Sequence, residues 1–436
     1  MINLSLNFET VSLGEHLYIK GRIGWKGLKK EEYLDQGDYR IINATALEEE
    51  GINWDDCGYI SKERFEESPE IILKDKDILI SKDGTIGKLG YVKNLEMDST
   101  VASGIFVVRN QNEEYIDTDF LYYYFKSPFF KWFIKSVTEG SVIPHLYQRD
   151  FTDMEFNLFD LDTQKKCSSI LNAIEEKINV NRKINKNLEE QIETVYNSFF
   201  VYYDDFSIEE LEECEIGLIP KEWDLLSLGE VTTQIKEKVG NNDYKVFSAV
   251  NTGNLILSED YFDKQVFSKS IEKYIVVKQK EFAYNPARVN IGSIGRNDFD
   301  YDGCVSPVYV AFKVEEGYEN FVNMFIKSKR FNQWVVTLAS GSVRQTLNYT
   351  DFSMIKIAYP PKDLIEKFNI IYESYYEVIN HNNSMISNLE KIRDILLPKL
   401  MSGEIDVSQI NCDDFLFVKI IHITTLILRY LIEEII

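Results

Sequence analysis

Apolar residues recur at alternating spacings of three and four positions along two long segments, one from Leu171 to Phe199 and one from Tyr372 to Leu400. This spacing is typical of an α-helix with a single apolar seam. Because such a seam is stable only when it is covered, we expect the two helices to pack against each other as an antiparallel coiled coil. The expected seam residues are Leu171, Ile174, Ile178, Asn181, Leu188, Ile192, Ile379, Asn382, Ile386, Leu389 and Leu396.

Two asparagines, Asn181 and Asn382, occupy equivalent positions on these otherwise apolar seams. One interpretation is that both side chains face solvent. The other is that they form a polar layer that determines the register of the helix pair, and we favour this second interpretation.

Each long helix is preceded by short apolar runs that are typical of β-strands, for example 39–42, 78–80 and 105–108, with glycine and aspartate in the turns between them. An aromatic segment that we expect to be helical then leads to each long helix, at 120–137 and at 321–338. The chain therefore shows the same order of elements twice.

Short strings also occur twice, in the same order. Ser12-Leu13-Gly14-Glu15 recurs at 227–230, Asp38-Tyr39-Arg40 resembles 243–245, Ile86-Gly87-x-Leu89-Gly90 resembles 291–295, Gly140-Ser141-Val142 recurs at 341–343, and Asp150-Phe151 recurs at 351–352. Matches that keep one order predict two copies of a single unit.

These patterns predict an α+β fold in which two β-rich domains are joined by two long antiparallel helices forming a coiled-coil spacer, with an internal pseudo-two-fold repeat. The expected segments are a first β-rich domain at 1–161, a first helix at 162–201, an acidic linker at 202–222, a second β-rich domain at 223–361, a second helix at 362–407 and an apolar tail at 408–436.

The chain carries 48 Lys and Arg against 71 Asp and Glu, a formal net charge of −23. This charge argues against a uniformly basic surface but not against nucleic acid, which proteins also bind through local patches. Basic and polar residues near the repeated glycine turns and in one N-terminal cluster are therefore candidates for DNA contacts, and a solvated surface position is the alternative for each. The candidates are Lys20, Arg22, Lys26, Lys29, Lys30, Lys82, Thr85, Lys88, Ser141, His145, Arg288, Asn290, Arg296, Ser342, Arg344 and Gln345.

The sequence contains no recognisable catalytic or metal-binding motif. It has neither a G-x-x-x-x-G-K-[ST] phosphate loop nor an H-E-x-x-H motif, and its five cysteines form no C-x-x-C pair. Tyr284-Asn285-Pro286-Ala287 lacks the second proline and the final aromatic residue of the adenine-methyltransferase motif that it partly matches. We therefore expect a cytoplasmic binding protein with no metal or cofactor of its own. Charges interrupt the apolar run 415–436, so we expect no membrane span.

Three strings resemble the specificity subunit of type I restriction–modification systems. They are the repeated Ser-Leu-Gly-Glu, Gly217-Leu218-Ile219-Pro220-Lys221-Glu222-Trp223, and Leu396-Leu397-Pro398-Lys399-Leu400-Met401-Ser402-Gly403-Glu404-Ile405. The similarity covers about residues 10 to 407, and the tail up to 436 has no counterpart in the family pattern.

The resemblance implies a non-catalytic subunit with two target recognition domains, each of which reads one half of a split site in double-stranded DNA. The helices would set the spacing of the halves and dock two methyltransferase subunits, which bring S-adenosylmethionine. Restriction subunits would add translocation and cleavage with ATP and Mg. One alternative is a silent scaffold that docks methyltransferase but reads no DNA, and another is a single-chain methyltransferase or nuclease. Salt-dependent binding to a split sequence would distinguish the first two, and S-adenosylmethionine binding by the isolated chain would support the third.

A substitution on the apolar seam tests the predicted helix pair. Leu188→Asp places a charge on the apolar seam, so we expect it to lower the free energy of unfolding by on the order of a few kcal/mol or to release the methyltransferase subunit. Denaturant unfolding and size-exclusion chromatography measure the two effects. An unaltered complex of unaltered stability would argue against the helix pair.

Overall fold

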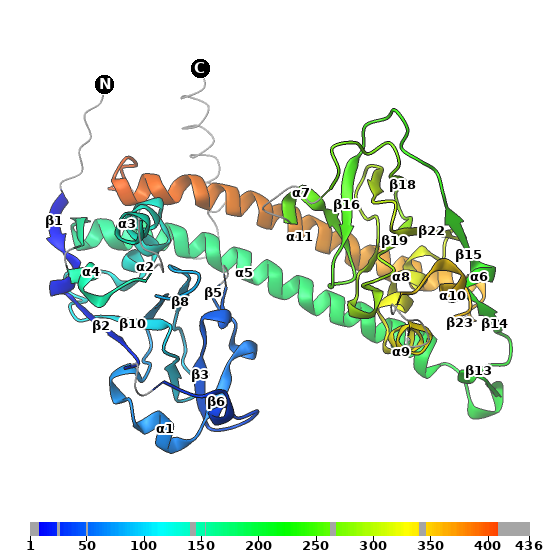
Figure 1. Cartoon of the computed structure of the whole chain (residues 1–436), viewed down its shortest axis with the longest axis horizontal. Helices are drawn as coiled ribbons and strands as arrows, with labels where there is room; N and C mark the ends of the chain where they lie inside the picture. The colour runs from blue at the N-terminus through cyan, green and yellow to red at the C-terminus, as the bar shows by residue number, and fades with distance from the viewer. Residues whose placement is uncertain are drawn as a thin grey trace. The chain divides into compact units, whose positions relative to one another are not determined.

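The computed structural model describes residues 8–23, 27–48, 51–139, 145–152, 154–261, 267–339 and 346–408. The chain forms two compact units, one within residues 1–181 and 384–436 and the other within residues 182–383. Both boundaries fall inside long helices, α5 (Leu161–Asn197) and α11 (Lys362–Ser402), which are drawn in Figure 1. Each unit therefore combines one β-rich region with part of both helices, which differs from the linear division expected from the sequence.

The β-rich region of the first unit contains two main sheets. One has the strand order β2-β10-β7-β8, and the other has the order β6-β3-β9 with β3 and β9 parallel. Antiparallel pairs also join β1 to β11 and β4 to β5. The strands are β1 (Phe8–Ser12), β2 (Leu17–Gly21), β3 (Tyr39–Ile42), β4 (Leu47–Glu48), β5 (Gly51–Ile52), β6 (Gly58–Ile60), β7 (Ile78–Ser81), β8 (Leu89–Tyr91), β9 (Ser99–Val101), β10 (Ile105–Asn110) and β11 (Glu155–Phe159).

The first three residues of strand β7 are apolar because both faces of the strand are covered. Ile78 and Ile80 belong to the core that also contains the aromatic residues of α2 (Thr118–Lys126) and α3 (Pro128–Thr138). Leu79, which points to the other face, belongs to a second core with residues of β3 and β9. Side chains alternate across a strand, so a strand between two cores needs apolar residues at every position. Short helices α1 (Lys62–Glu66) and α4 (Gln148–Thr152) complete the unit.

The second unit repeats this topology, which confirms the predicted duplication. The sheet β15-β22-β19-β20 corresponds to β2-β10-β7-β8, the pair β14–β23 corresponds to β1–β11, and β16 and β21 are parallel like β3 and β9. The elements are β14 (Asp224–Ser227), α6 (Leu228–Val231), β15 (Thr232–Ile235), β16 (Lys245–Ala249), β17 (Leu255–Leu257), α7 (Ser258–Tyr261), β18 (Ile275–Val277), β19 (Phe282–Tyr284), β20 (Ile294–Arg296), β21 (Gly303–Val305), β22 (Val310–Val314), α8 (Glu319–Lys327), α9 (Lys329–Ala339), α10 (Tyr349–Phe352) and β23 (Lys356–Tyr359).

The segment expected to be an acidic linker contains a β-hairpin. After a π-helical turn at Ser198–Tyr202, strands β12 (Leu211–Cys214) and β13 (Gly217–Pro220) pair antiparallel. Ile219 and the following Trp223 are buried in the core of the second unit, while the acidic side chains of β12 face solvent. Ile219 and Trp223 therefore hold this segment against the second β-rich region, a contact that the charge of the segment did not predict.

In the first unit, the beginning of α5 packs antiparallel against the end of α11. Cys167 Sγ lies 3.9 Å from the carbonyl oxygen of Leu400, and further along α5 the Arg393 guanidinium donates to Glu175 at 3.3 Å. Residue numbers thus fall on α11 as they rise on α5. The seam residues Leu171, Ile174, Ile178, Ile386, Leu389 and Leu396 are all buried in the core of this unit.

In the second unit, the end of α5 packs antiparallel against the beginning of α11. The rings of Tyr196 and Phe368 lie 6.1 Å apart, and Ile192 and Ile379 are buried in the same core. Leu188 is partly buried against this core. The helix pairing expected from the two apolar stripes is therefore present within each unit.

The polar layer of the seam includes Asn382 but pairs it with Asn185. The Asn382 amide donates to Asn185 Oδ1 at 2.8 Å, and the Asn185 amide donates to Asn383 Oδ1 at 2.8 Å. Asn181 is also buried, and its Nδ2 has no hydrogen-bond partner among the described residues. The expected pair was Asn181 with Asn382, which are equivalent in the repeat. In the antiparallel helix pair, Asn382 instead lies opposite Asn185.

No helix in the described ranges is long and apolar enough to span a membrane. Residues 409–436, which include all but the first residue of the predicted tail, lie outside the described residues.

The two asparagines should respond in opposite directions to the same substitution. Asn181→Leu removes a buried donor without a partner, so we expect it to raise the free energy of unfolding by roughly 1–3 kcal/mol. Asn382→Leu leaves the Asn185 carbonyl oxygen without its donor, so we expect a loss of similar size. Urea denaturation of both variants measures the difference, and a destabilising Asn181→Leu would show that its amide is satisfied.

Candidate nucleic-acid interface

A glycine turn connects β7 to β8 in the first unit. The Ser81 hydroxyl donates to the carbonyl oxygen of Thr85 at 2.6 Å and accepts from the Lys88 amide at 2.8 Å. Gly87 has φ +86°, and a Cβ there would lie 2.6 Å from Ile134 Cδ1 of α3. The turn therefore packs closely against α3, and its positive φ favours glycine at this position.

The corresponding turn of the second unit lies between β19 and β20. It contains the 3₁₀ helix η9 (Val289–Ile291), which ends at Gly292 with φ +86°. A Cβ on Gly292 would lie 2.6 Å from the carbonyl oxygen of Asn251, which follows β16. Glycine is therefore required for the close approach of these two turns.

Three parts of the second unit enclose a cleft of about 390 Å³: the turn at 251–253, the turn at 289–292 and the junction between α8 and α9. Its floor is formed by the buried apolar side chains of Val289, Ile294, Ile326 and Phe331. Its rim is polar, and no aspartate or glutamate lines it. The lining residues are Asn251, Thr252, Gly253, Val289, Asn290, Ile291, Gly292, Ile294, Ile326, Lys327, Ser328, Lys329, Phe331 and Asn332.

Of the residues that line this cleft, the sequence analysis predicted Asn290. It missed those of the turn at 251–253 and those of the junction between α8 and α9. A further repeated string marks the junction between α8 and α9, because Lys-Ser-x-x-Phe occurs at 126–130 and again at 327–331. Comparing the copies beyond the five strings that we used would therefore have shown this junction. The turn at 251–253 has no such signal.

Arg22 and Arg296, which we had considered as DNA contacts, are buried. Arg22 is 2% exposed and donates to the Val101 carbonyl oxygen at 3.2 Å and to Ser68 Oγ at 3.3 Å. Burial lowers the pKa of its guanidinium. A guanidinium has five donors, so in the interior it can join segments that are distant in the chain. Both arginines therefore make internal hydrogen bonds, and neither is available for a DNA contact.

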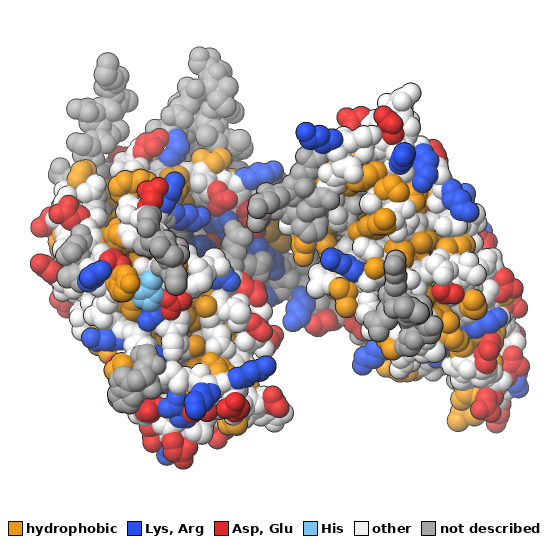
Figure 2. All heavy atoms as spheres, viewed as in Figure 1, with side chains coloured by type: hydrophobic (Ala, Val, Ile, Leu, Met, Phe, Trp, Pro, Cys, Tyr) orange, Lys and Arg blue, Asp and Glu red, His pale blue; other side chains and the backbone are white. Residues whose placement is uncertain are grey.

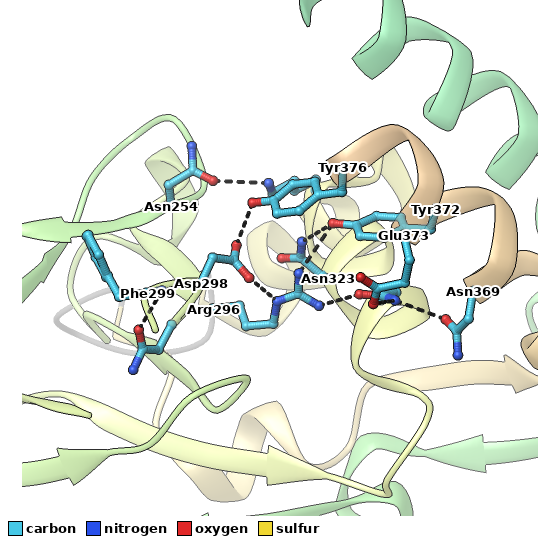
Figure 3. Close-up of polar contacts among 12 residues, drawn as sticks. Asn254, Arg296, Asp298, Phe299, Asn323, Asn369, Tyr372, Glu373 and Tyr376 are labelled. Carbon is cyan, nitrogen blue, oxygen red and sulfur yellow. Dashed lines mark hydrogen bonds and ion pairs between the residues drawn. The ribbon is translucent and has the colours of Figure 1, made fainter. Parts of the chain in front are cut away.

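Arg296 lies at the centre of a polar network in the second unit (Figure 3). Its guanidinium donates to Asp298 at 2.5 Å, to Asn320 at 2.6 Å and to the Tyr372 hydroxyl at 3.4 Å. The Tyr376 hydroxyl donates to the other oxygen of Asp298 at 3.1 Å. Burial raises the pKa of both phenols. The network therefore joins strand β20 to α8 and α11.

The first unit has a network of different residues at the same place. Asp119 of α2 accepts hydrogen bonds from the Tyr91 hydroxyl of β8 and, at 2.6 Å, from the Asn172 amide of α5. The Tyr123 hydroxyl donates to Asn172 Oδ1 at 2.9 Å. Sequence reasoning missed both networks, because their members are far apart in the chain.

The remaining candidates differ in exposure. Lys29, Lys30, Thr85, Arg288 and Asn290 are exposed, and Lys20, Lys82, Lys88 and His145 are partly buried. Lys82 lies 4.9 Å from the centre of the Phe106 ring, and burial lowers the pKa of its amine. His145 pairs with Asp83 of the glycine turn. Five candidates lie outside the described residues, namely Lys26, Ser141, Ser342, Arg344 and Gln345.

Figure 2 shows acidic and basic side chains intermixed over the visible face of each unit. On α3 of the first unit, Trp132 is 72% exposed between Lys131 and Lys135, a combination that sequence reasoning also missed. Among the described residues, no cluster of three or more His, Cys, Asp or Glu side chains could hold a metal ion.

Comparison with known proteins finds one matching domain and several similar chains. Residues 6–190 match the model of the type I restriction modification DNA specificity domain. The type I restriction enzyme MjaIX specificity subunit of Methanocaldococcus jannaschii is 25% identical, over 78% of this chain and 82% of that protein. The type I restriction enzyme MjaVIII specificity subunit of the same organism is 23% identical, over 93% of this chain and 94% of that protein. Residues 6–190 therefore carry a type I restriction modification DNA specificity domain, and the chain as a whole is similar to type I restriction enzyme specificity subunits.

The fold of the chain agrees with that of a solved structure. The type I restriction–modification S subunit from M. genitalium aligns with a TM-score of 0.54 at 15% identity, and the alignment covers 92% of this chain and 97% of that one. The predicted α+β architecture with two β-rich regions and two long helices is therefore confirmed.

Arg296, which is buried, and Arg288, which is exposed, provide a matched pair in the second unit. Arg296→Met leaves Asp298 and Asn320 without their charged donor, so we expect the free energy of unfolding to fall by about 3 kcal/mol. Arg288→Met removes an exposed guanidinium and should change the free energy of unfolding by at most about 0.5 kcal/mol. Equal effects of the two variants in thermal unfolding would contradict the structural role of Arg296.

Proposed function

We propose that this chain is the DNA-specificity subunit of a type I restriction–modification complex and reads a bipartite site, one half with each β-rich region. The observation that carries the proposal is the duplication itself. Residues 6–190, which include the β-rich region of the first unit, match the DNA specificity domain, and the main sheet of the second unit has the same strand order as that of the first. Two equivalent modules in one chain suit a ligand with two separated sites, and a DNA sequence with two half-sites is such a ligand.

The side chains at equivalent positions support two different half-sites. The glycine turn carries Thr85 and Lys88 in the first unit, and the turn of the second unit carries Arg288 and Asn290. Arginine and asparagine recognise guanine and adenine edges, whereas lysine mainly contacts phosphate or guanine. A shared scaffold with different polar groups is what separate recognition of two sequences requires.

We further propose that the helices dock two methyltransferase subunits, which would supply S-adenosylmethionine, and that restriction subunits would supply ATP-driven translocation and Mg-dependent cleavage. In this arrangement the chain itself performs no catalysis. Exposed apolar side chains support a docking role for the helices. Ile370 is 73% and Val378 is 45% exposed on α11 of the second unit, although both belong to a long helix whose seam is already covered.

Sequencing of methylated bases tests this proposal. Co-expression of the chain with its methyltransferase subunit in a host that lacks adenine methylation should produce one methylated bipartite motif. The same host with the methyltransferase subunit alone should show none. A stable complex of the two proteins without any methylated motif would contradict the proposal and indicate a scaffold that does not read DNA.

A further inference from the structure

The cleft of the second unit has the composition of an anion- and amide-binding site. Its polar rim comprises three carboxamides, two hydroxyls and the ammonium groups of Lys327 and Lys329. It contains no carboxylate, although the chain carries 71 of them and a net charge of −23. Its volume of about 390 Å³ falls within the range of roughly 300–1,000 Å³ that is usual for small-molecule sites.

Most of these polar groups are available to a ligand. The side chains of Asn251, Asn290, Asn332 and Lys329 are exposed and make no hydrogen bond or ion pair within the described part of the chain. Lys327 is held by one hydrogen bond, which its ammonium donates to Asn254 at 3.1 Å. The cleft therefore presents unpaired donors and acceptors above an apolar floor.

The walls of the cleft are held in place. A Cβ on Gly292 would lie 2.6 Å from the carbonyl oxygen of Asn251, and a Cβ on Gly253 would lie 3.4 Å from Lys327 Cε, so neither turn has room to spare. At the start of α9, the Ser328 hydroxyl accepts a hydrogen bond from the Phe331 amide at 3.2 Å. Strand β20, which carries the floor residue Ile294, is anchored by the Arg296 network. Rigid walls reduce the ordering cost of binding.

We propose that this cleft holds one nucleotide of the second half-site. Lys327, Lys329 and the amino-terminal end of α9 would bind its phosphate, and the apolar floor would contact its base or sugar. The carboxamides of Asn251, Asn290 and Asn332 would bind the edge of the base, because an amide can donate to and accept from an adenine simultaneously. This inference rests on the proposed function and assigns its second recognition site to particular residues.

The first unit carries different residues at the equivalent positions. The repeated strings align Thr85 with Asn290, Pro128 with Lys329 and Lys131 with Asn332. Substitutions in the cleft should therefore affect recognition of the second half-site only, which separates a reading role from a general contribution to DNA affinity.

The test uses the full chain in complex with its methyltransferase subunit and labelled duplexes that carry the mapped motif, with each base pair of both half-sites changed in turn. Binding is measured by fluorescence anisotropy at several salt concentrations. We expect Asn290→Ala and Asn332→Ala each to reduce discrimination at one position of the second half-site by about 5- to 150-fold and to leave the first half-site unchanged. Lys329→Ala should weaken binding to every duplex and reduce the salt slope of log affinity by about 1.

Two controls are matched to these variants. Asn241→Ala and Lys236→Ala remove exposed side chains of the same types elsewhere in the second unit, and neither should change discrimination or the salt slope. Asn332→Lys introduces the residue type that the first unit has at this position. It should keep the fold, which thermal unfolding verifies, and should lose discrimination at the same base pair as Asn332→Ala.

The outcomes separate the two proposals. A wild-type complex that binds no duplex even at low salt would overturn the proposed function and this inference together. A wild-type complex that binds its bipartite site, with cleft variants that retain full discrimination and salt slope, would overturn the inference alone. Competition by millimolar deoxyadenosine monophosphate with the wild-type complex, but not with Asn332→Ala, would identify a free-nucleotide site and also overturn it.

Discussion

The apolar seam between α5 and α11 is the contact on which the rest of the structure depends. Neither helix can bury its stripe alone, and antiparallel packing brings the beginning of one helix to the end of the other. The first unit consequently needs residues near 400 to complete a core that begins at Val11. In the sequence, the residues of the second unit, 182–383, form one continuous stretch between the two segments of the first unit. The duplicated chain is thus interleaved, because each copy of the β-rich region is completed by a helix segment from the other copy.

Each β-rich region is attached to this seam by polar contacts as well as apolar ones. In the second unit the Arg296 network joins β20 to α11, and in the first unit the Tyr91–Asp119–Asn172 network joins β8 to α5. Strands β8 and β20 each follow a glycine turn. Buried hydrogen-bond networks accept few alternative geometries, so they hold a turn in one position relative to the helix of its own unit. A surface that reads bases requires such positioning, because hydrogen bonds lose their strength over small displacements.

The electrostatic design is local. A chain of net charge −23 repels DNA at long range, and the basic side chains are dispersed over the visible surface of both units (Figure 2). The cleft of the second unit differs from this background, since its lining has two lysines and no carboxylate. Under the proposed function, long-range attraction to DNA would have to come from the partner subunits, and local groups such as those of the cleft would provide selectivity.

The sequence by itself determined the two long helices, their seam and the duplication, because helical periodicity and repeated strings are local properties that need no knowledge of the fold. Only the tertiary structure decided what each polar residue does. Arg288 and Arg296 are eight positions apart, yet one is exposed and the other is buried against Tyr372 of a distant helix. Asn382 has a partner in Asn185, whereas the amide nitrogen of Asn181 has none among the described residues. The cost of burying a polar group depends on its partners, and these partners come from segments that lie far away in the chain.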